Sequence, residues 1–173
     1  MTEKEFLNAV SECGEDVLQI FLDALSETRV DYCVIGGLAV NAYAEPVVSL
    51  DLDVVVATSD VEVVCRAVQD HFKMEHFAHS VNLSTDKSNL RIQLQTDPRY
   101  QDFIIRAETH TVLGYRMRVA CLEDVFQGKL WAYSDKERRK SKRQKDLADI
   151  VRLAEVYPFL ADRLPEEIRK RID

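Results

Sequence analysis

The 173-residue sequence has no Cys-x-x-Cys pair, no internal repeat, no low-complexity tract apart from one charge run, and no apolar stretch of membrane-spanning length. Its four cysteines are widely scattered, which argues against a zinc site and favours reduced thiols in a cytoplasmic protein. The N-terminal segment Met-Thr-Glu-Lys-Glu lacks an apolar run of the secretory type, so we expect no membrane association. With 46% hydrophobic and 31% charged residues, the chain can form one globular core.

The net charge of −7 is unevenly distributed along the chain. From residue 136 to the C-terminus, twelve Lys and Arg oppose eight Asp and Glu, so this segment carries +4 and the first 135 residues carry −11. An acidic body of this kind excludes nonspecific coating of nucleic acid by charge alone, but a local basic patch remains open.

The order of expected elements predicts an α+β protein. A capping box at Thr2 and Glu5 begins a helix that we expect to reach about Glu27, and a second box from Ser59 to Glu62 begins a helix to about Phe72. Further ranges follow from periodicity and breakers: strands over 31–35, 50–57, 74–77, 82–85 and 90–95, a short helix over 38–44, a hairpin over 109–113 and 116–120, and helices after residue 121 with breaks near Pro158 and Pro165.

This pattern predicts a mixed β-sheet flanked by helices, followed by a C-terminal helical segment. We expect residues 1–120 to form the α/β core with its N-terminal helix. Residues 121–173 would pack on that core, giving a single compact unit.

A Gly36-Gly37 pair closes the apolar strand at 31–35 and precedes the short helix. Glycines allow the backbone to approach a ligand closely, and the start of a helix presents unpaired N–H groups, so this turn is a candidate phosphate cradle. A simple tight turn is the alternative interpretation.

Two carboxylates follow thirteen residues after the glycines, in Ser49-Leu-Asp51-Leu-Asp53. Residues two apart in a strand point to the same side, so Ser49, Asp51 and Asp53 share one face of the sheet. Adjacent like charges repel each other, and a divalent cation such as Mg²⁺ would remove that cost. Solvent-facing acids on an exposed surface are the alternative, but the apolar run after Asp53 indicates an interior strand.

Gly-Gly, thirteen residues and Asp-Leu-Asp closely resemble the signature of the nucleotidyltransferase superfamily of the DNA polymerase β type. Within it, the chain resembles the small bacterial AbiEii-type abortive-infection toxins. The segment Val119-Ala-Cys-Leu-Glu-Asp-Val-Phe-Gln-Gly-Lys129 and the later Lys145-Asp-Leu-Ala-Asp-Ile150 are similar to that group's lysine helix and Lys-Asp helix. The resemblance covers about residues 30–155.

The resemblance implies transfer of a nucleoside monophosphate from a nucleoside triphosphate to an acceptor hydroxyl. Gly36 and Gly37 would hold the triphosphate together with Ser49, which keeps the hydroxyl of the family's Arg-x-Thr-x-Asp motif although its arginine is replaced by Val47. Asp51 and Asp53 would be the catalytic, Mg²⁺-binding carboxylates, and Lys129 and Lys145 would reach the triphosphate.

Gln93 departs from the superfamily pattern, which has a third carboxylate on the strand that corresponds to 90–95. A glutamine can bind a metal through its oxygen but cannot accept a proton from the acceptor hydroxyl. Asp97 or Asp102 could substitute from the following loop. Arg91 shares a face with Gln93 and could instead neutralise one of the two aspartates.

The segment from Lys136 to Lys145 contains seven basic residues in ten. A solvated helix face or loop is the default interpretation of such a run. In a phosphate-handling protein, its outer residues could instead bind RNA. The residues concerned are Arg138, Arg139, Lys142 and Arg143.

Two hypotheses follow. The first is a Mg²⁺-dependent nucleotidyltransferase that modifies an RNA end or a protein hydroxyl, as one component of a toxin–antitoxin pair with a cognate antitoxin protein. The second is a catalytically lapsed nucleotidyltransferase fold that binds a nucleotide or a partner protein. A small-molecule nucleotidyltransferase of the antibiotic-modifying type is a third option.

Overall fold

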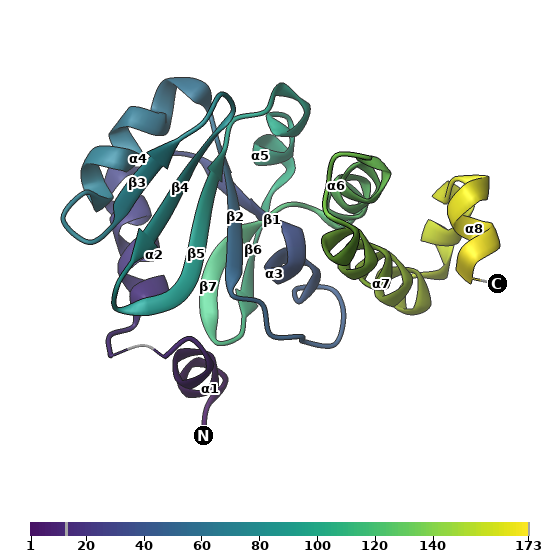
Figure 1. The fold of residues 1–173 in the computed structure, drawn as a ribbon, viewed down its shortest axis with the longest axis horizontal. Coiled ribbons are helices and arrows are strands. Elements are labelled where there is room, and N and C mark those ends of the chain that lie inside the picture. The colour runs from purple at the N-terminus through teal and green to yellow at the C-terminus, as the bar shows by residue number, and fades with distance from the viewer. Residues whose placement is uncertain (13, 173) are drawn as a thin grey trace.

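A seven-stranded mixed sheet forms the centre of the protein in the computed structural model, which describes residues 1–12 and 14–172 (Figure 1). The strand order is β3-β4-β5-β2-β1-β7-β6. The strands are β1 (Tyr32–Ile35), β2 (Asp51–Val56), β3 (Lys73–His76), β4 (Ser80–Thr85), β5 (Ser88–Gln95), β6 (Glu108–Val112) and β7 (Tyr115–Val119). The expectation of a reduced thiol at Cys13 lies outside the described residues.

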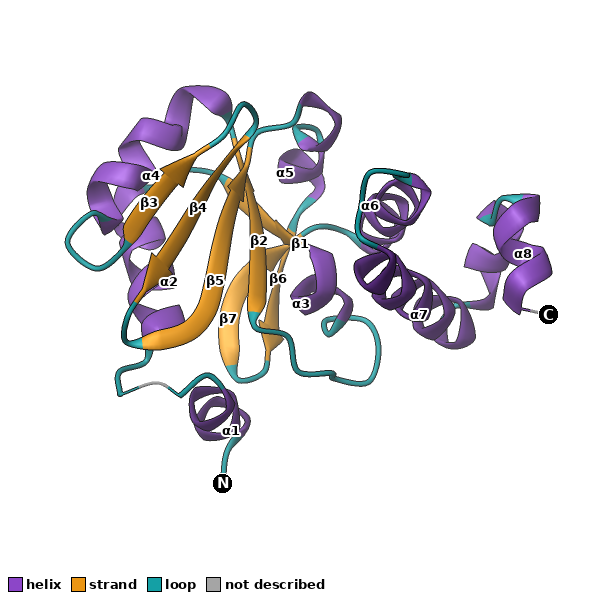
Figure 2. Ribbon diagram, in the orientation of Figure 1, coloured by secondary structure: helices purple, strands orange, loops and turns teal. Residues whose placement is uncertain are grey.

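Helices flank the sheet and form the C-terminal segment (Figure 2). They are α1 (Glu3–Val10), α2 (Val17–Thr28), α3 (Gly36–Val40), α4 (Val61–Val68), α5 (Phe103–Arg106), α6 (Leu122–Ser134), α7 (Lys140–Val156) and α8 (Glu166–Ile172). Short 3-10 turns occupy residues 58–60, 98–100 and 158–163. The predicted mixed sheet flanked by helices, with helices to the C-terminus, is therefore confirmed.

The expected N-terminal helix is divided in two. The Thr2 hydroxyl accepts a hydrogen bond from the Glu5 amide, and the Glu5 carboxylate accepts one from the Thr2 amide, so this capping box is confirmed. A single helix to Glu27 is wrong, because α1 ends at Val10 and α2 begins after Asp16, which caps it by accepting from the Gln19 amide. Polar residues and Gly14 interrupt the apolar period between them.

The second predicted capping box is also wrong. The segment from Thr58 to Asp60 forms a 3-10 turn, and α4 begins only at Val61, without a side-chain cap. The Ser59 hydroxyl donates to the Asp60 carboxylate at 3.4 Å instead of capping the helix. The helix itself is present where the periodicity predicts it, but it ends at Val68.

The two faces of the central strands differ in chemistry. Leu52 on β2, Ile92 on β5 and Leu83 on β4 lie opposite one another in register and are fully buried. They belong to the core on the side of the sheet that α2 and α4 cover (Figure 1). Because side chains alternate along a strand, the residues between them point to the other face, where Asp51, Asp53 and Gln93 lie.

The C-terminal helices cover part of that second face. Helices α6 and α7 pack against each other, and both contact α3 (Figure 1). The chain breaks at Pro158 and Pro165 are where the sequence predicts them, and a further break separates α6 from α7. Within the described residues, no helix is both long and apolar enough to cross a lipid bilayer. The proposed division at residue 120 stays a prediction.

Candidate nucleotide and metal site

The diglycine turn and the acidic strand are in direct contact. Gly36 directly follows β1 as the first residue of α3 and has φ of +75°, a backbone conformation that side-chain-bearing residues rarely adopt. A Cβ added at Gly36 would collide with Oδ2 of Asp53, whereas one at Gly37 would lie 3.5 Å from Oγ of Ser49, an ordinary contact. Gly36 is therefore required both by its backbone angle and by the neighbouring carboxylate.

Ser49 orders the start of β2. Its hydroxyl accepts from the Asp51 amide at 3.3 Å and donates to the Asp51 carbonyl at 3.2 Å. The loop before it is fixed by Asn41, whose side-chain amide donates to the Val47 carbonyl at 2.8 Å and accepts from the Val47 amide at 3.0 Å. These contacts hold the hydroxyl beside the glycine turn, as the sequence predicts.

The two aspartates have different environments. Burial raises the pKa of Asp53, and the Asp51 charge raises it further, although Lys129, Arg138 and Lys142 partly oppose the shift. Asp51 forms an ion pair with Arg91, in which Nε of Arg91 lies 2.9 Å from Oδ1 of Asp51. The Arg91 side chain is 68% exposed. The neutralisation of an aspartate by Arg91 thus occurs at Asp51, through a surface pair of the kind that is weak and readily rearranged.

Gln93 occupies the position where a third carboxylate would lie. It pairs in register with Asp53 on one side and with Asn82 on the other. Its Nε2 donates to Oδ1 of Asn82 at 3.0 Å. Asp97 instead caps a 3-10 turn and pairs with Arg99, and neither Asp97 nor Asp102 lines the cavity that contains the acidic pair.

Lys129 belongs to a buried charge network between α6 and α7. Its ammonium lies 3.0 Å from Asp146 Oδ1 and 2.7 Å from Asp149 Oδ2. Burial lowers the pKa of Lys129, but the two carboxylates outweigh that effect and raise it. Each carboxylate also pairs with an arginine. Nε of Arg138 lies 2.6 Å from Oδ2 of Asp146, and Nη1 of Arg152 lies 2.7 Å from Oδ1 of Asp149. The network joins the two helices, and a direct role of Lys129 in triphosphate binding stays a prediction.

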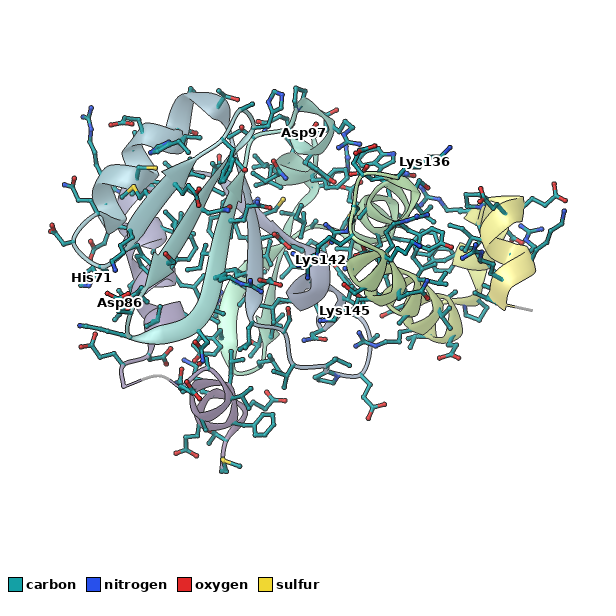
Figure 3. The ribbon with its side chains drawn as sticks, viewed as in Figure 1. His71, Asp86, Asp97, Lys136, Lys142 and Lys145 are labelled. Atoms are coloured by element: carbon teal, nitrogen blue, oxygen red, sulfur yellow. The ribbon has the colours of Figure 1, made fainter. Side chains whose placement is uncertain are left out.

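A cavity of about 630 Å³ connects these groups. One wall is the polar face of β2, β5, β4 and β3, and the other is the cationic face of α7. Figure 3 shows Lys142 and Lys145 projecting from α7 toward the sheet, whereas Lys136 lies at the outer end of the helix pair. The polar lining residues are Ser49, Asp51, Asp53, Lys73, Glu75, Asn82, Ser84, Arg91, Gln93, Lys129, Arg138, Lys142, Lys145, Asp146, Asp149 and Arg152.

The basic run divides between three environments. Arg138 and Lys142 line the cavity, and RNA binding by them stays a prediction. Arg143 donates to the Tyr133 carbonyl at 2.7 Å and lies over the Tyr133 ring, which ties α7 to α6. Arg139 alone of the four is exposed. These basic residues are close together in the sequence, but the helix directs their side chains to different sides.

The donor set at the acidic pair suits a hard cation. Within residues 1–12 and 14–172, no group of three or more His, Cys, Asp or Glu side chains is placed to hold a metal ion. The oxygen donors available are Asp51, Asp53 and the amide oxygen of Gln93, which are ligands of the type that Mg²⁺ prefers.

Sequence reasoning missed Asn82, Glu75 and Arg152 as members of this site. Asn82 and Ser84 alternate with Val81 and Leu83 on β4, so strand alternation could have placed Asn82 on the polar face. Arg152 also donates to the Glu45 carbonyl and to Asn41, and the sequence gives no signal for these two contacts because both residues lie more than one hundred positions away.

Solved structures share this fold at low sequence identity. The lincosamide antibiotic adenylyltransferase LnuA, bound to lincomycin, superposes with a TM-score of 0.58 at 12% identity over 82% of this chain and 99% of that one. ANT(2")-Ia in complex with adenylyl-2"-tobramycin gives 0.61 at 13% identity over 91% and 97%. A putative nucleotidyltransferase from Thermotoga maritima gives 0.53 at 17% identity over 76% and 86%. These similarities show a nucleotidyltransferase fold.

No curated protein sequence matches the chain at a significant level. The family model for the nucleotidyl transferase AbiEii toxin of type IV toxin–antitoxin systems matches residues 20–173, which is most of the chain and includes the glycine turn, the acidic pair and the Lys129 network. The protein therefore belongs to the AbiEii nucleotidyltransferase family.

Proposed function

We propose that the protein is a Mg²⁺-dependent nucleotidyltransferase. The observation that carries this proposal is that Gly37, Asp51 and Asp53 line one cavity together with two lysines of α7, Lys142 and Lys145. The carboxylates on one wall can bind a metal ion, and the cations on the facing wall can bind a polyphosphate. A nucleoside triphosphate with its bound Mg²⁺ matches both walls.

In this proposal, the residues around the acidic pair and on the facing helix have defined tasks. Asp51 and Asp53 hold Mg²⁺, which when bound supplies charge neutralisation and alignment of the triphosphate. Gly37 and Ser49 line the cavity beside the carboxylates and would contact the phosphates, and Gly36 allows the turn to lie against Asp53. Lys142 and Lys145 face that space from α7 and balance the phosphate charge, with Lys129 and Arg138 behind them.

The proposed reaction is an in-line displacement at the α-phosphorus. The acceptor hydroxyl oxygen forms a bond to that phosphorus, the bond to the bridging oxygen of the β-phosphate breaks, and pyrophosphate leaves. The hydroxyl proton goes to solvent, because Gln93 has no basic site where other members of the superfamily have a carboxylate.

We propose an RNA end or a protein hydroxyl as the acceptor, and a cognate antitoxin as the partner. The description of the family as toxins of a type IV toxin–antitoxin system supports this assignment. The exposed Arg139 beside the α7 wall supports a polyanionic acceptor.

The test offers total tRNA, total RNA depleted of tRNA, and a protein extract as acceptors, together with the four α-labelled nucleoside triphosphates and Mg²⁺. Label should appear on one acceptor class and be lost in an Asp51→Asn/Asp53→Asn variant. Asp70→Asn, an exposed aspartate outside the cavity, is the matched control and should label normally. Label that persists in the double variant contradicts the proposed site.

The replacement of the third carboxylate by Gln93 favours a second candidate, a lapsed fold that binds nucleotide without transfer. It predicts that a nucleoside triphosphate raises the melting temperature in a manner that depends on Asp51 and Asp53, with no pyrophosphate released whatever acceptor is offered.

A further inference from the structure

A row of polar side chains crosses four strands next to the acidic pair. Strand register places Asp53 opposite Gln93, Gln93 opposite Asn82, and Asn82 opposite Glu75. All four side chains line the cavity. Neighbouring strands are about 4.8 Å apart. Across the sheet from Asp53, Gln93 is therefore one strand away and Asn82 is two strands away.

The hydrogen bond between the two amides has a direction. Gln93 uses its Nε2 to donate to Oδ1 of Asn82 at 3.0 Å. The oxygen and nitrogen of an amide diverge from the same carbon, so donation toward β4 turns Oε1 of Gln93 away from Asn82 and toward β2. Among the described residues, no protein group donates a hydrogen bond to that Oε1.

We propose that Gln93 supplies a neutral oxygen ligand to the metal of the acidic pair, and that Asn82 is a positioning residue that turns this oxygen toward Asp53. This inference rests on the proposed function, because it requires the metal at Asp51 and Asp53. In this inference, the amide oxygen of Gln93 replaces the missing third carboxylate as a metal ligand. It does not replace that carboxylate as a base.

A flipped Gln93 would defeat metal binding. With its amino group toward Asp53, the side chain would present two N–H donors to a cation, which repel it. A flip of Gln93 alone would set its Oε1 against Oδ1 of Asn82, two acceptors with no proton between them, so Asn82 opposes the flip unless it turns as well. A partner that orients a ligand in this way commonly changes metal affinity by tenfold or more.

The test measures Mn²⁺ affinity of the purified full chain by the EPR signal of free Mn²⁺. Gln93→Met keeps the length of the side chain without its oxygen, and we expect about a tenfold loss of affinity. Asn82→Ala removes the acceptor and should lose a similar factor. Asn82→Asp retains an acceptor atom at the same place and should bind at least as tightly as wild type. Gln93→Glu adds a charge and should bind more tightly.

A second readout separates ligation from a merely structural effect. In protein labelled with ¹³C at the glutamine side-chain carbonyls, pulsed EPR of bound Mn²⁺ should detect a coupling to ¹³C. That coupling should vanish in Gln93→Met and Asn82→Ala and persist in Asn82→Asp. If Gln93→Met binds Mn²⁺ with wild-type affinity or keeps the ¹³C coupling, the ligand assignment is overturned. If Asn82→Ala keeps both the wild-type affinity and the ¹³C coupling, the positioning role is overturned.

The outcome also distinguishes this inference from the proposed function. Binding that is lost in Asp51→Asn/Asp53→Asn but unchanged in Gln93→Met overturns the inference alone. Absence of Mn²⁺ binding in the wild type, or binding that is unaffected by the double aspartate variant, contradicts both.

Discussion

Gly36 lies against Asp53: a Cβ added at residue 36 would collide with Oδ2 of the Asp53 carboxylate, which would have to move away. Gly36 comes directly after Ile35, which pairs with Asp53 in the antiparallel ladder of β1 and β2. The positive φ of Gly36 imposes a second, independent requirement for glycine. The acidic pair and the glycine turn therefore form one structural unit.

Gly36→Ala should destabilise the protein strongly. The substitution combines an unfavourable backbone angle with the collision at Asp53, and we expect a loss of about 2–4 kcal/mol in the free energy of unfolding. Gly37→Ala is the matched control, because its Cβ would make only an ordinary contact with Ser49 at 3.5 Å. Chemical denaturation measures both. Equal losses in the two variants would contradict the asymmetry between the glycines.

Asp53→Asn should stabilise the metal-free protein. Burial and the neighbouring Asp51 raise the folded-state pKa of Asp53 above its ordinary value of 3.8, so the ionised carboxylate lowers the stability of the fold. The neutral amide removes this cost, and we expect a melting temperature higher by about 2 °C or more at neutral pH.

The sign of the pH dependence follows from the same shift. The penalty is fully present above the folded-state pKa of Asp53, decreases as the pH falls through it, and is absent below 3.8, where the carboxyl is protonated in both states. The difference in melting temperature between variant and wild type should decrease accordingly in thermal scans at decreasing pH. A wild type that is more stable than Asp53→Asn at neutral pH without metal would contradict this explanation.

Arg91→Met should increase the affinity for Mn²⁺. In the absence of metal, Arg91 pairs with Asp51 at 2.9 Å and competes with a cation for that carboxylate. The pair is exposed and worth at most about 1 kcal/mol, so the expected gain is up to about fivefold at low salt.

Added salt should reduce this gain, because ions screen the guanidinium charge. Arg66→Met, which breaks an exposed pair with Glu62 on α4, is the matched control and should leave Mn²⁺ affinity unchanged. An Arg91→Met variant with weaker Mn²⁺ binding would indicate instead that the guanidinium supports the site.

Lys129→Met should destabilise the packing of α6 on α7. The variant leaves the buried carboxylates of Asp146 and Asp149 without their shared ammonium, and loss of one partner of a buried ion pair costs about 3 kcal/mol or more. Lys170→Met, which breaks the exposed pair with Glu166, should cost less than about 1 kcal/mol. Denaturant titration of both variants tests the contrast, and similar losses would show that burial of the network is unimportant.

The sequence predicts the elements whose signals are local. The apolar run after Asp53, the glycine pair and the turn at Gly114 predicted β2, the site turn and the β6–β7 hairpin close to their observed bounds. The shared face of Ser49, Asp51 and Asp53 follows from strand period alone. The break between α1 and α2 was missed because the apolar residues before and after it, such as Val10 and Val17, can be joined at an approximately helical spacing if the polar residues and Gly14 between them are disregarded.

The contacts of the site depend on long-range geometry and were only partly predictable. The pairing of Gln93 with Asn82 needs the register of β4 on β5, and the position of Arg138 inside the cavity needs the angle between α6 and α7. The sequence of the basic run does not show which way each side chain points. Its division into residues that line the cavity, residues that contact α6 and exposed residues could therefore not be predicted.

A crystal structure of the protein with Mn²⁺ and a triphosphate that cannot release pyrophosphate tests the central claim most directly. We predict an anomalous difference peak within about 2.2 Å of both the Asp51 and the Asp53 carboxylates, with the phosphates beside Gly36 and Gly37 and Arg91 displaced from Asp51. A peak elsewhere in the molecule, or none while Arg91 remains bonded to Asp51, would contradict the account.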